Sequence, residues 1–179
     1  MKERWLLAAN IGMFAIIALL SAGIQTVLWY QFIGAVTAPA LWLLPILYFA
    51  LRRKSSHGII LVYATCLLMA PMTATSLGIL LFSSLLLLFS CAGLKERVKW
   101  EGYSYTAVLC GLGSLLFNLY NYFATWVFQS KLALSPDLLS WIVQALMTAI
   151  VGQLFFSVFS VVDRLTKQEE FVEPQIQIL

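Results

Sequence analysis

The chain has 179 residues, of which 61% are hydrophobic and only 11% are charged, and its mean hydropathy is +0.90. A soluble domain carries about 25% charged residues, so this composition excludes an ordinary soluble protein and indicates one that crosses the membrane several times. The net charge of +3 gives no reason to expect nucleic acid as a partner.

Six apolar segments are predicted to be membrane-spanning helices, because about 20 apolar residues cross a bilayer. In chain order they cover residues 5–29, 32–51, 58–70, 76–94, 102–128 and a last segment that starts after Pro136 and ends near 162. The first is longer than the apolar core of a signal peptide, so we expect it to be retained. The second contains Pro39 and Pro45, and the third is short and stops at Pro71. We therefore predict an all-α polytopic membrane protein, with six transmembrane helices in one bundle over residues 1–163 and a polar cytoplasmic tail over residues 164–179.

The basic residues predict how this bundle sits in the membrane. With six spans and both termini in the cytoplasm, only Lys131 of the eleven Lys and Arg residues falls on the outer side. The others lie in cytoplasmic segments, as the positive-inside rule requires. Five spans would divide these basic clusters between the two sides, so six spans with both termini in the cytoplasm are preferred.

Residues that carry catalytic or metal-binding chemistry are scarce in the apolar segments. No Asp, Glu, Lys, Arg or His lies inside a predicted span, which argues against proton relays and ion-coupled transport. His57 and Asp163 are predicted on the cytoplasmic side and Asp137 on the outer side, and no nucleophile is predicted beside Asp163. The three cysteines lack the spacing of a disulfide framework or a zinc site. We therefore expect no enzyme activity, no metal and no cofactor.

One helical face of segment 102–128 is small and polar. At about 100° per residue, this face carries Gly111, Ser114, Asn118, Asn121, Thr125 and Gln129. The opposite face carries Leu109, Leu112, Leu116, Leu119, Phe123 and Val127, which suit lipid. An asparagine that faces lipid is costly, so we predict that the polar face is buried against protein or a polar cavity. The last segment carries Gln144 and Thr148 on one face and Gln153 on roughly the opposite face, which predicts contacts on both sides.

Three interpretations of these polar side chains stay open. The first is packing between helices of the same bundle, with interhelical hydrogen bonds of about 0.6–2 kcal/mol each. The second is an interface with a partner membrane protein. The third is a small-molecule pocket, lined by Asn118, Asn121, Tyr120 and Tyr122 in the aromatic-rich half of the segment.

Several stretches of the chain resemble one known family. The first predicted helix ends "ALLSAGIQTVLW", and "APALWLLPILYFALRRKSSHGIIL" joins a proline-led second helix to a basic turn and a glycine. The fourth helix opens in "ATSLGILLFSSLLLLF", and the sixth ends "LFFSVFSVVDRLTK". This order resembles the MreD family of rod-shape-determining membrane proteins over nearly the whole chain, through Gln25, Pro39, Tyr48, Gly58, Leu77, Gly78, Asp163 and Arg164. One departure is that the third helix lacks the acidic residue that this family often has there.

The resemblance implies a non-catalytic integral membrane subunit of the bacterial cell-elongation complex, which synthesises peptidoglycan and sets rod shape. It implies a place in the bacterial inner membrane, in contact with lipids. It also implies integral membrane partners, namely MreC-like, RodA-like and transpeptidase subunits, and no nucleic acid. On this interpretation the helix-interface or partner-binding residues are Gly111, Ser114, Asn118, Asn121, Thr125, Gln129, Gln144, Thr148 and Gln153.

Length and helix number are also similar to those of the substrate-binding S component of an energy-coupling-factor vitamin transporter. In those proteins a small-residue face of the first helix packs against the coupling subunit, and the candidates here are Ala8, Gly12, Ala15, Ala18 and Ala22. A closed cavity at the aromatic end of segment 102–128 would favour the vitamin binder. A filled bundle with an exposed small or polar groove would favour the cell-elongation subunit.

Overall fold

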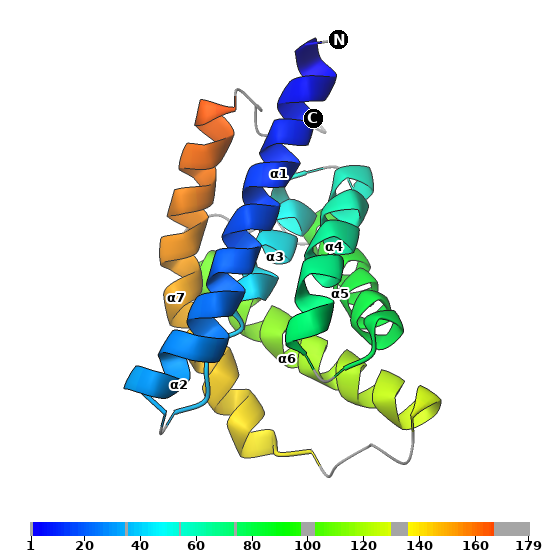
Figure 1. Ribbon diagram of the computed structural model, residues 1–179, viewed down its shortest axis with the longest axis vertical. Coiled ribbons are helices and arrows are strands. Elements are labelled where there is room, and N and C mark those ends of the chain that lie inside the picture. The colour runs from blue at the N-terminus through cyan, green and yellow to red at the C-terminus, as the bar shows by residue number, and fades with distance from the viewer. Residues whose placement is uncertain are drawn as a thin grey trace, which may run out of the picture.

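The computed structural model describes residues 2–34, 36–53, 55–73, 75–97, 103–129 and 136–166, and in these ranges the regular elements are helices (Figure 1). The helices are α1 (Lys2–Gly23), α2 (Trp29–Phe32), α3 (Leu44–Arg52), α4 (Ser55–Met69), α5 (Leu77–Arg97), α6 (Tyr103–Phe128) and α7 (Leu138–Leu165). A π-helical turn (Ile24–Leu28) joins α1 to α2, and 3₁₀ turns precede α3 (Leu41–Leu43) and follow α4 (Ala70–Met72). The prediction of an all-α chain is confirmed.

Four helical stretches are long and apolar enough to cross a membrane, by length and composition. They are Ala8–Phe32, Leu77–Leu94, Tyr105–Phe128 and Leu138–Leu165. Two shorter apolar helices, Leu41–Arg52 and Ser56–Met72, lie between the first and second of these spans. At 1.5 Å per residue, Leu41–Arg52 is about 18 Å long, well short of the ~30 Å hydrocarbon core. The chain is thus a multi-pass membrane protein that combines long spans with two shorter apolar helices.

The prediction of one helix over residues 32–51 is wrong in its first part. Residues 36–40 are not helical, and the helix begins only at the 3₁₀ turn Leu41–Leu43. Pro39 explains the break, since proline has no N–H to donate and disfavours helical backbone at the residue before it. Pro45 lies in the first turn of α3, where a missing N–H is tolerated. The break leaves a stretch of backbone that must find hydrogen-bond partners elsewhere.

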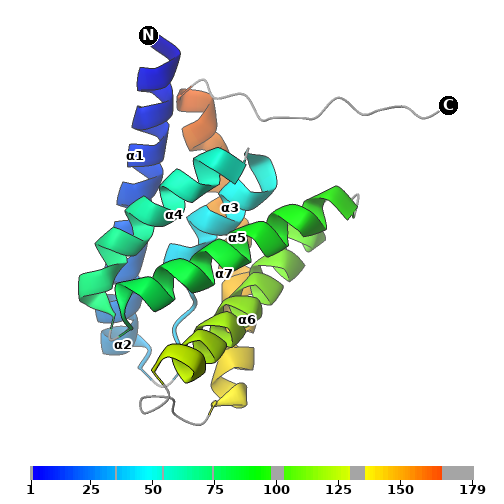
Figure 2. The same cartoon turned by 90° about the vertical axis from the view of Figure 1, so that its right-hand side faces the viewer.

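The short helix α3 lies at the centre of the bundle, in contact with α1, α4, α5, α6 and α7. α5 and α6 run together at an incline to α1 (Figure 2), and the N-terminal end of α1 lies at the same end of the bundle as the C-terminal end of α7 (Figure 1). Every residue from Leu41 to Leu51 is buried. Phe49 packs edge-on to Phe14 of α1, and Tyr48 packs edge-on to Phe159 of α7, with ring centroids 4.8 and 5.3 Å apart. Aromatic packing therefore places α3 between α1 and α7.

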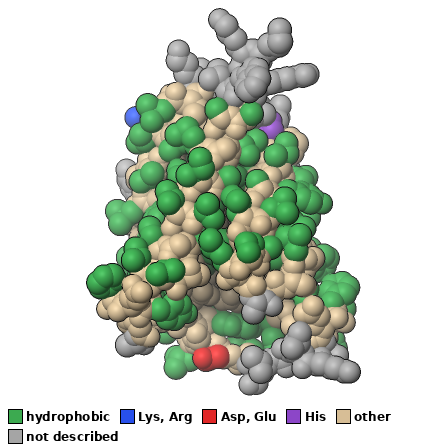
Figure 3. Space-filling view, viewed as in Figure 1, with side chains coloured by type: hydrophobic (Ala, Val, Ile, Leu, Met, Phe, Trp, Pro, Cys, Tyr) green, Lys and Arg blue, Asp and Glu red, His purple; other side chains and the backbone are tan. Residues whose placement is uncertain are grey.

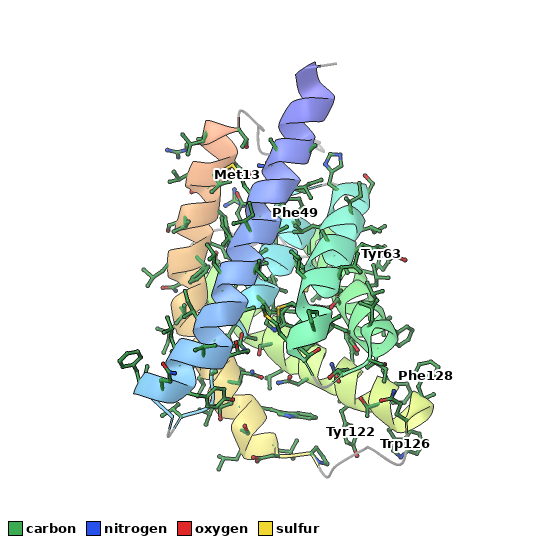
Figure 4. The ribbon with its side chains drawn as sticks, in the orientation of Figure 1. Met13, Phe49, Tyr63, Tyr122, Trp126 and Phe128 are labelled. Carbon is green, nitrogen blue, oxygen red and sulfur yellow. The ribbon has the colours of Figure 1, made fainter. Side chains whose placement is uncertain are left out.

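The surface of the bundle suits lipid. Hydrophobic side chains are spread over the face seen in Figure 3, and the coloured charged and histidine side chains lie near its two ends. Phe49 lies inside the bundle and is 1% exposed, whereas Tyr63 and Phe128 point outward and are 50% and 65% exposed (Figure 4). Helix α7 exposes an apolar row that includes Leu146, Ile150, Leu154, Val158 and Val161. Such a surface calls for an apolar solvent.

Glycines let α6 and α7 pack closely. A Cβ atom at Gly152 would lie 2.6 Å from the sulfur of Cys110, and one at Gly111 would lie 3.3 Å from the carbonyl oxygen of Ala145. Small residues at such a seam let two backbones approach and bring polar side chains within bonding range. The seam thus places the polar face of α6 against α7.

Candidate functional site

Polar side chains from two other helices bond the backbone at the start of the 3₁₀ turn that leads into α3. The Ala40 N–H donates to Thr148 Oγ1 of α7 at 2.9 Å, and the Leu41 N–H donates to Gln25 Oε1 of the π-helical turn at 3.1 Å. Thr148 lies about 15 Å along α7 from its first residue, at a depth where lipid offers no hydrogen-bond partner. The two side chains therefore supply acceptors for N–H groups that the chain break leaves without helical partners.

Gln144 and Asn118 extend this arrangement to the carbonyl before the break. Gln144 Nε2 donates to the Ala38 carbonyl oxygen at 3.1 Å, and Asn118 Nδ2 donates to Gln144 Oε1 at 2.7 Å. Asn118 therefore orients the amide that holds the broken stretch, and it does so across the seam between α6 and α7. We call Gln25, Asn118, Gln144 and Thr148 the N-end clamp of α3.

The other residues of the polar face of α6 lie before and after Asn118. Ser114, one turn earlier, is buried, and its hydroxyl has no hydrogen-bond partner within the described ranges of the chain. Beyond Asn118, Thr125 Oγ1 donates to Asn121 Oδ1 at 3.4 Å, and the Gln129 N–H donates to the Thr125 carbonyl oxygen at 2.7 Å. These last two contacts stay within α6. Among the described residues, Asn118 therefore makes the hydrogen bond that joins this face to α7.

Gln153 of α7 and Leu109 of α6 are both assigned to helix faces by their spacing. Gln153 is half-buried on another flank of α7, where its carbonyl oxygen accepts the Ser157 hydroxyl at 3.2 Å. The prediction that Leu109 suits lipid is wrong, because Leu109 is buried in the core, whereas Leu112 and Leu119 of the same row are each 50% exposed. Helix α6 contacts α5 as well as α7, so the part of its surface that is buried against protein is wider than the polar face alone.

A second polar cluster lies at the other end of α3 and centres on Asp163 of α7. Asp163 Oδ2 accepts the Tyr48 hydroxyl at 2.7 Å, while Oδ1 accepts Arg53 Nη2 at 2.6 Å and Asn10 Nδ2 at 3.0 Å. Asn10 Nδ2 also donates to Thr166 Oγ1 at 2.7 Å. All five residues are buried. We call Asn10, Tyr48, Arg53, Asp163 and Thr166 the C-end network of α3.

Sequence reasoning did not find the C-end network. It places Asp163 in the cytoplasm and ends the last helix near Val162, but α7 continues to Leu165, and Asp163 faces into the bundle from its last turn. A signal was present in Asn10, a lone amide in an apolar run. The predicted tail over residues 164–179 therefore begins inside α7, and residues 167–179 lie outside the described residues.

The two clusters share a regular spacing. Asn10 and Gln25 are 15 residues apart in the α1 stretch, and Thr148 and Asp163 are 15 residues apart in α7. At 1.5 Å per residue, each pair spans about 22 Å. The α1 stretch and α7 therefore each contact both ends of α3, which is held lengthwise between them.

Comparisons with known proteins leave the family open. The chain matches no family model, no curated protein and no solved structure. Among the described residues, no group of three or more His, Cys, Asp or Glu is placed to hold a metal ion.

The aromatic residues of the ligand-pocket interpretation contact neighbouring helices. The Tyr120 hydroxyl lies 2.8 Å from the Ser90 hydroxyl of α5. The Tyr122 ring packs edge-on to Trp141 of α7, with centroids 6.0 Å apart, near the end of the bundle where Figure 4 labels it. With Asn118 bonded to Gln144, three of the four side chains of that hypothesis meet other helices of the same chain.

Proposed function

We propose that this chain is a non-catalytic membrane subunit of the bacterial cell-elongation complex, similar to MreD, which acts through contacts between helices in the plane of the inner membrane. The observation that carries the proposal is the position of the residues on which the resemblance depends. Gln25 and Pro39 lie where α3 begins, and Tyr48 bonds to Asp163 where it ends. Three of the residues that carry the resemblance, Gln25, Tyr48 and Asp163, thus belong to the two clusters that hold α3, which supports the proposal.

The polar contacts of α6 support a structural role over a binding pocket. Asn118 donates to Gln144, and Tyr120 bonds to Ser90, so both side chains already serve helix packing. A vitamin binder needs such groups free to meet a ligand. A subunit that assembles with other membrane proteins needs them to hold its own helices in place.

The first helix argues against the alternative, an S component of a vitamin transporter. That function requires the small-residue row of this helix to be on the surface for a coupling subunit. Ala15, Ala18 and Ala22 instead are 8%, 1% and 0% exposed, because they pack inside the bundle. Only Ala8 and Gly12 of the row remain accessible.

The proposal includes the orientation of the chain, with both termini in the cytoplasm. The three native cysteines are buried, which keeps the background low for labelling single introduced cysteines. Ser55→Cys is expected to react with a membrane-impermeant thiol reagent only in opened cells, and Ser135→Cys already in intact cells. Equal labelling of both in intact cells would contradict the orientation.

The role in cell elongation is tested by purification from the native bacterium in mild detergent. MreC-like, RodA-like and transpeptidase proteins are expected to co-purify, and depletion of the chain is expected to turn rods into round cells. Leu119→Ala, which changes an exposed residue on the lipid-facing side of α6, serves as the control variant. The chain with this substitution is expected to retain the same partner proteins. Recovery of transporter ATPases with unchanged cell shape would refute the proposal in favour of the S component.

A further inference from the structure

One buried element joins the N-end clamp to the C-end network. It runs from the 3₁₀ turn that starts at Leu41 through α3 to Arg52, and every residue up to Leu51 is buried. A helix with continuous internal hydrogen bonds moves as a unit along its axis. Close-packed interiors have low compressibility and transmit such displacements. A change at one end of α3 therefore reaches the other end.

We propose that α3 is a coupling rod between the two ends of the bundle. When the C-end network opens, α3 slides along its axis, and the N-end clamp loses its hold on the backbone of Ala40 and Leu41. This inference concerns the mechanics of the bundle and does not depend on the proposed function.

Arg53 sets the direction of the movement. Its side chain turns into the bundle to pair with Asp163, whereas the side chain of the preceding residue, Arg52, is exposed. Loss of the Asp163 charge leaves a guanidinium in the bundle without its carboxylate, which is costly. The C-terminal end of α3 then loses this tie to α7, and α3 shifts toward its own C-terminal end, away from the N-end clamp.

The clamp is sensitive to a small displacement. Its two bonds to backbone N–H groups measure 2.9 Å to Thr148 and 3.1 Å to Gln25. A separation of about 1 Å along these bonds lengthens both to about 4 Å, beyond the range of a hydrogen bond. The Leu41 N–H also donates to the Pro39 carbonyl oxygen at 2.9 Å, so the Ala40 amide is the more sensitive of the two. Thr148 and Gln25 stay in place because they belong to α7 and to the continuation of α1, which form the frame around the rod.

The experiment is hydrogen exchange, followed by mass spectrometry, on the full chain in detergent micelles. Asp163→Asn is expected to raise the exchange rate of amides in residues 36–43 about tenfold, the factor for the loss of one buried hydrogen bond. In the reverse direction, Thr148→Val is expected to raise exchange in residues 50–53. Tyr48→Phe, which keeps the ion pair and removes one bond to Asp163, gives a smaller effect at 36–43 and serves if Asp163→Asn does not fold.

A control variant separates coupling from general loss of stability. Thr65 is buried in α4 and donates to the carbonyls of Leu61 and Val62 in its own helix. Thr65→Val is expected to leave exchange in residues 36–43 unchanged, and the coupling variants are expected to leave residues 60–69 unchanged. Exchange that rises only beside the substituted residue would overturn the proposal. So would a uniform rise over the whole chain, which would show that the clusters contribute only to global stability.

Discussion

Replacing Gln144 by leucine removes two hydrogen bonds of the N-end clamp at once. The bond from Asn118 is one interhelical hydrogen bond, about 0.6–2 kcal/mol. The bond to Ala38 protects a carbonyl of a residue that is only 2% exposed, and a buried acceptor left without a partner costs about 1–3 kcal/mol. We therefore expect Gln144→Leu to lower the free energy of unfolding by about 1.6–5 kcal/mol. Asn118→Leu is expected to lower it by only about 0.6–2 kcal/mol, because the bond to Ala38 survives.

The assay is unfolding of the purified chain in mixed micelles by increasing SDS, followed by tryptophan fluorescence. Leu119→Ala is the matched control, since Leu119 is adjacent to Asn118 but 50% exposed, and we expect a change within about 0.5 kcal/mol. An equal loss of unfolding free energy for Asn118→Leu and Gln144→Leu would show that the bond from Gln144 to the Ala38 carbonyl depends on Asn118. A large cost for Leu119→Ala would show that the faces of α6 are assigned wrongly.

Two further predictions use the same unfolding assay. Asp163→Ala is expected to cost about 3–5 kcal/mol because it removes the carboxylate that pairs with Arg53. Changing Asp163 and Arg53 together to leucine is expected to cost less. A larger cost for the double variant would contradict the ion-pair argument. Gly152→Ala is expected to cost about 1–3 kcal/mol because its Cβ would lie 2.6 Å from the Cys110 sulfur. Gly93→Ala in α5 adds a Cβ that, apart from the backbone of its own helix, has no atom of the described residues within 4 Å. It is expected to stabilise by up to about 1 kcal/mol, and equal losses at both glycines would refute the close seam.

The long helices of this fold were predictable because lipid leaves little choice. A backbone in hydrocarbon must bond within its own segment, so a long apolar run becomes a helix. The break before α3 was signalled by Pro39, but its consequence was not. The groups that satisfy the broken backbone come from Gln25, Gln144 and Thr148, the last of them 108 positions from Ala40. Hydropathy and periodicity describe single segments and carry no information about such pairings.

The polar face of α6 and the C-end network show the same limit at closer range. Periodicity grouped Asn118 with Gly111 and Ser114, since residues three and four apart share a helix face. It could not name Gln144 as the partner. Asp163 at the end of an apolar run looks alike in sequence whether it faces water or turns inward. Its direction depends on Arg53 and Tyr48, which belong to a different part of the chain.

The way α3 is held has a consequence for how the protein is made. The ribosome completes α3 roughly 90 residues before it begins α7, which at about 5–20 residues per second is an interval on the order of ten seconds. Throughout that time Gln144, Thr148 and Asp163 do not yet exist, so the start of α3 lacks most of its clamp and Arg53 lacks its carboxylate. A short, proline-broken helix in that condition is a poor candidate for stable insertion on its own. Its final placement therefore waits until α7 has been made and packs beside it.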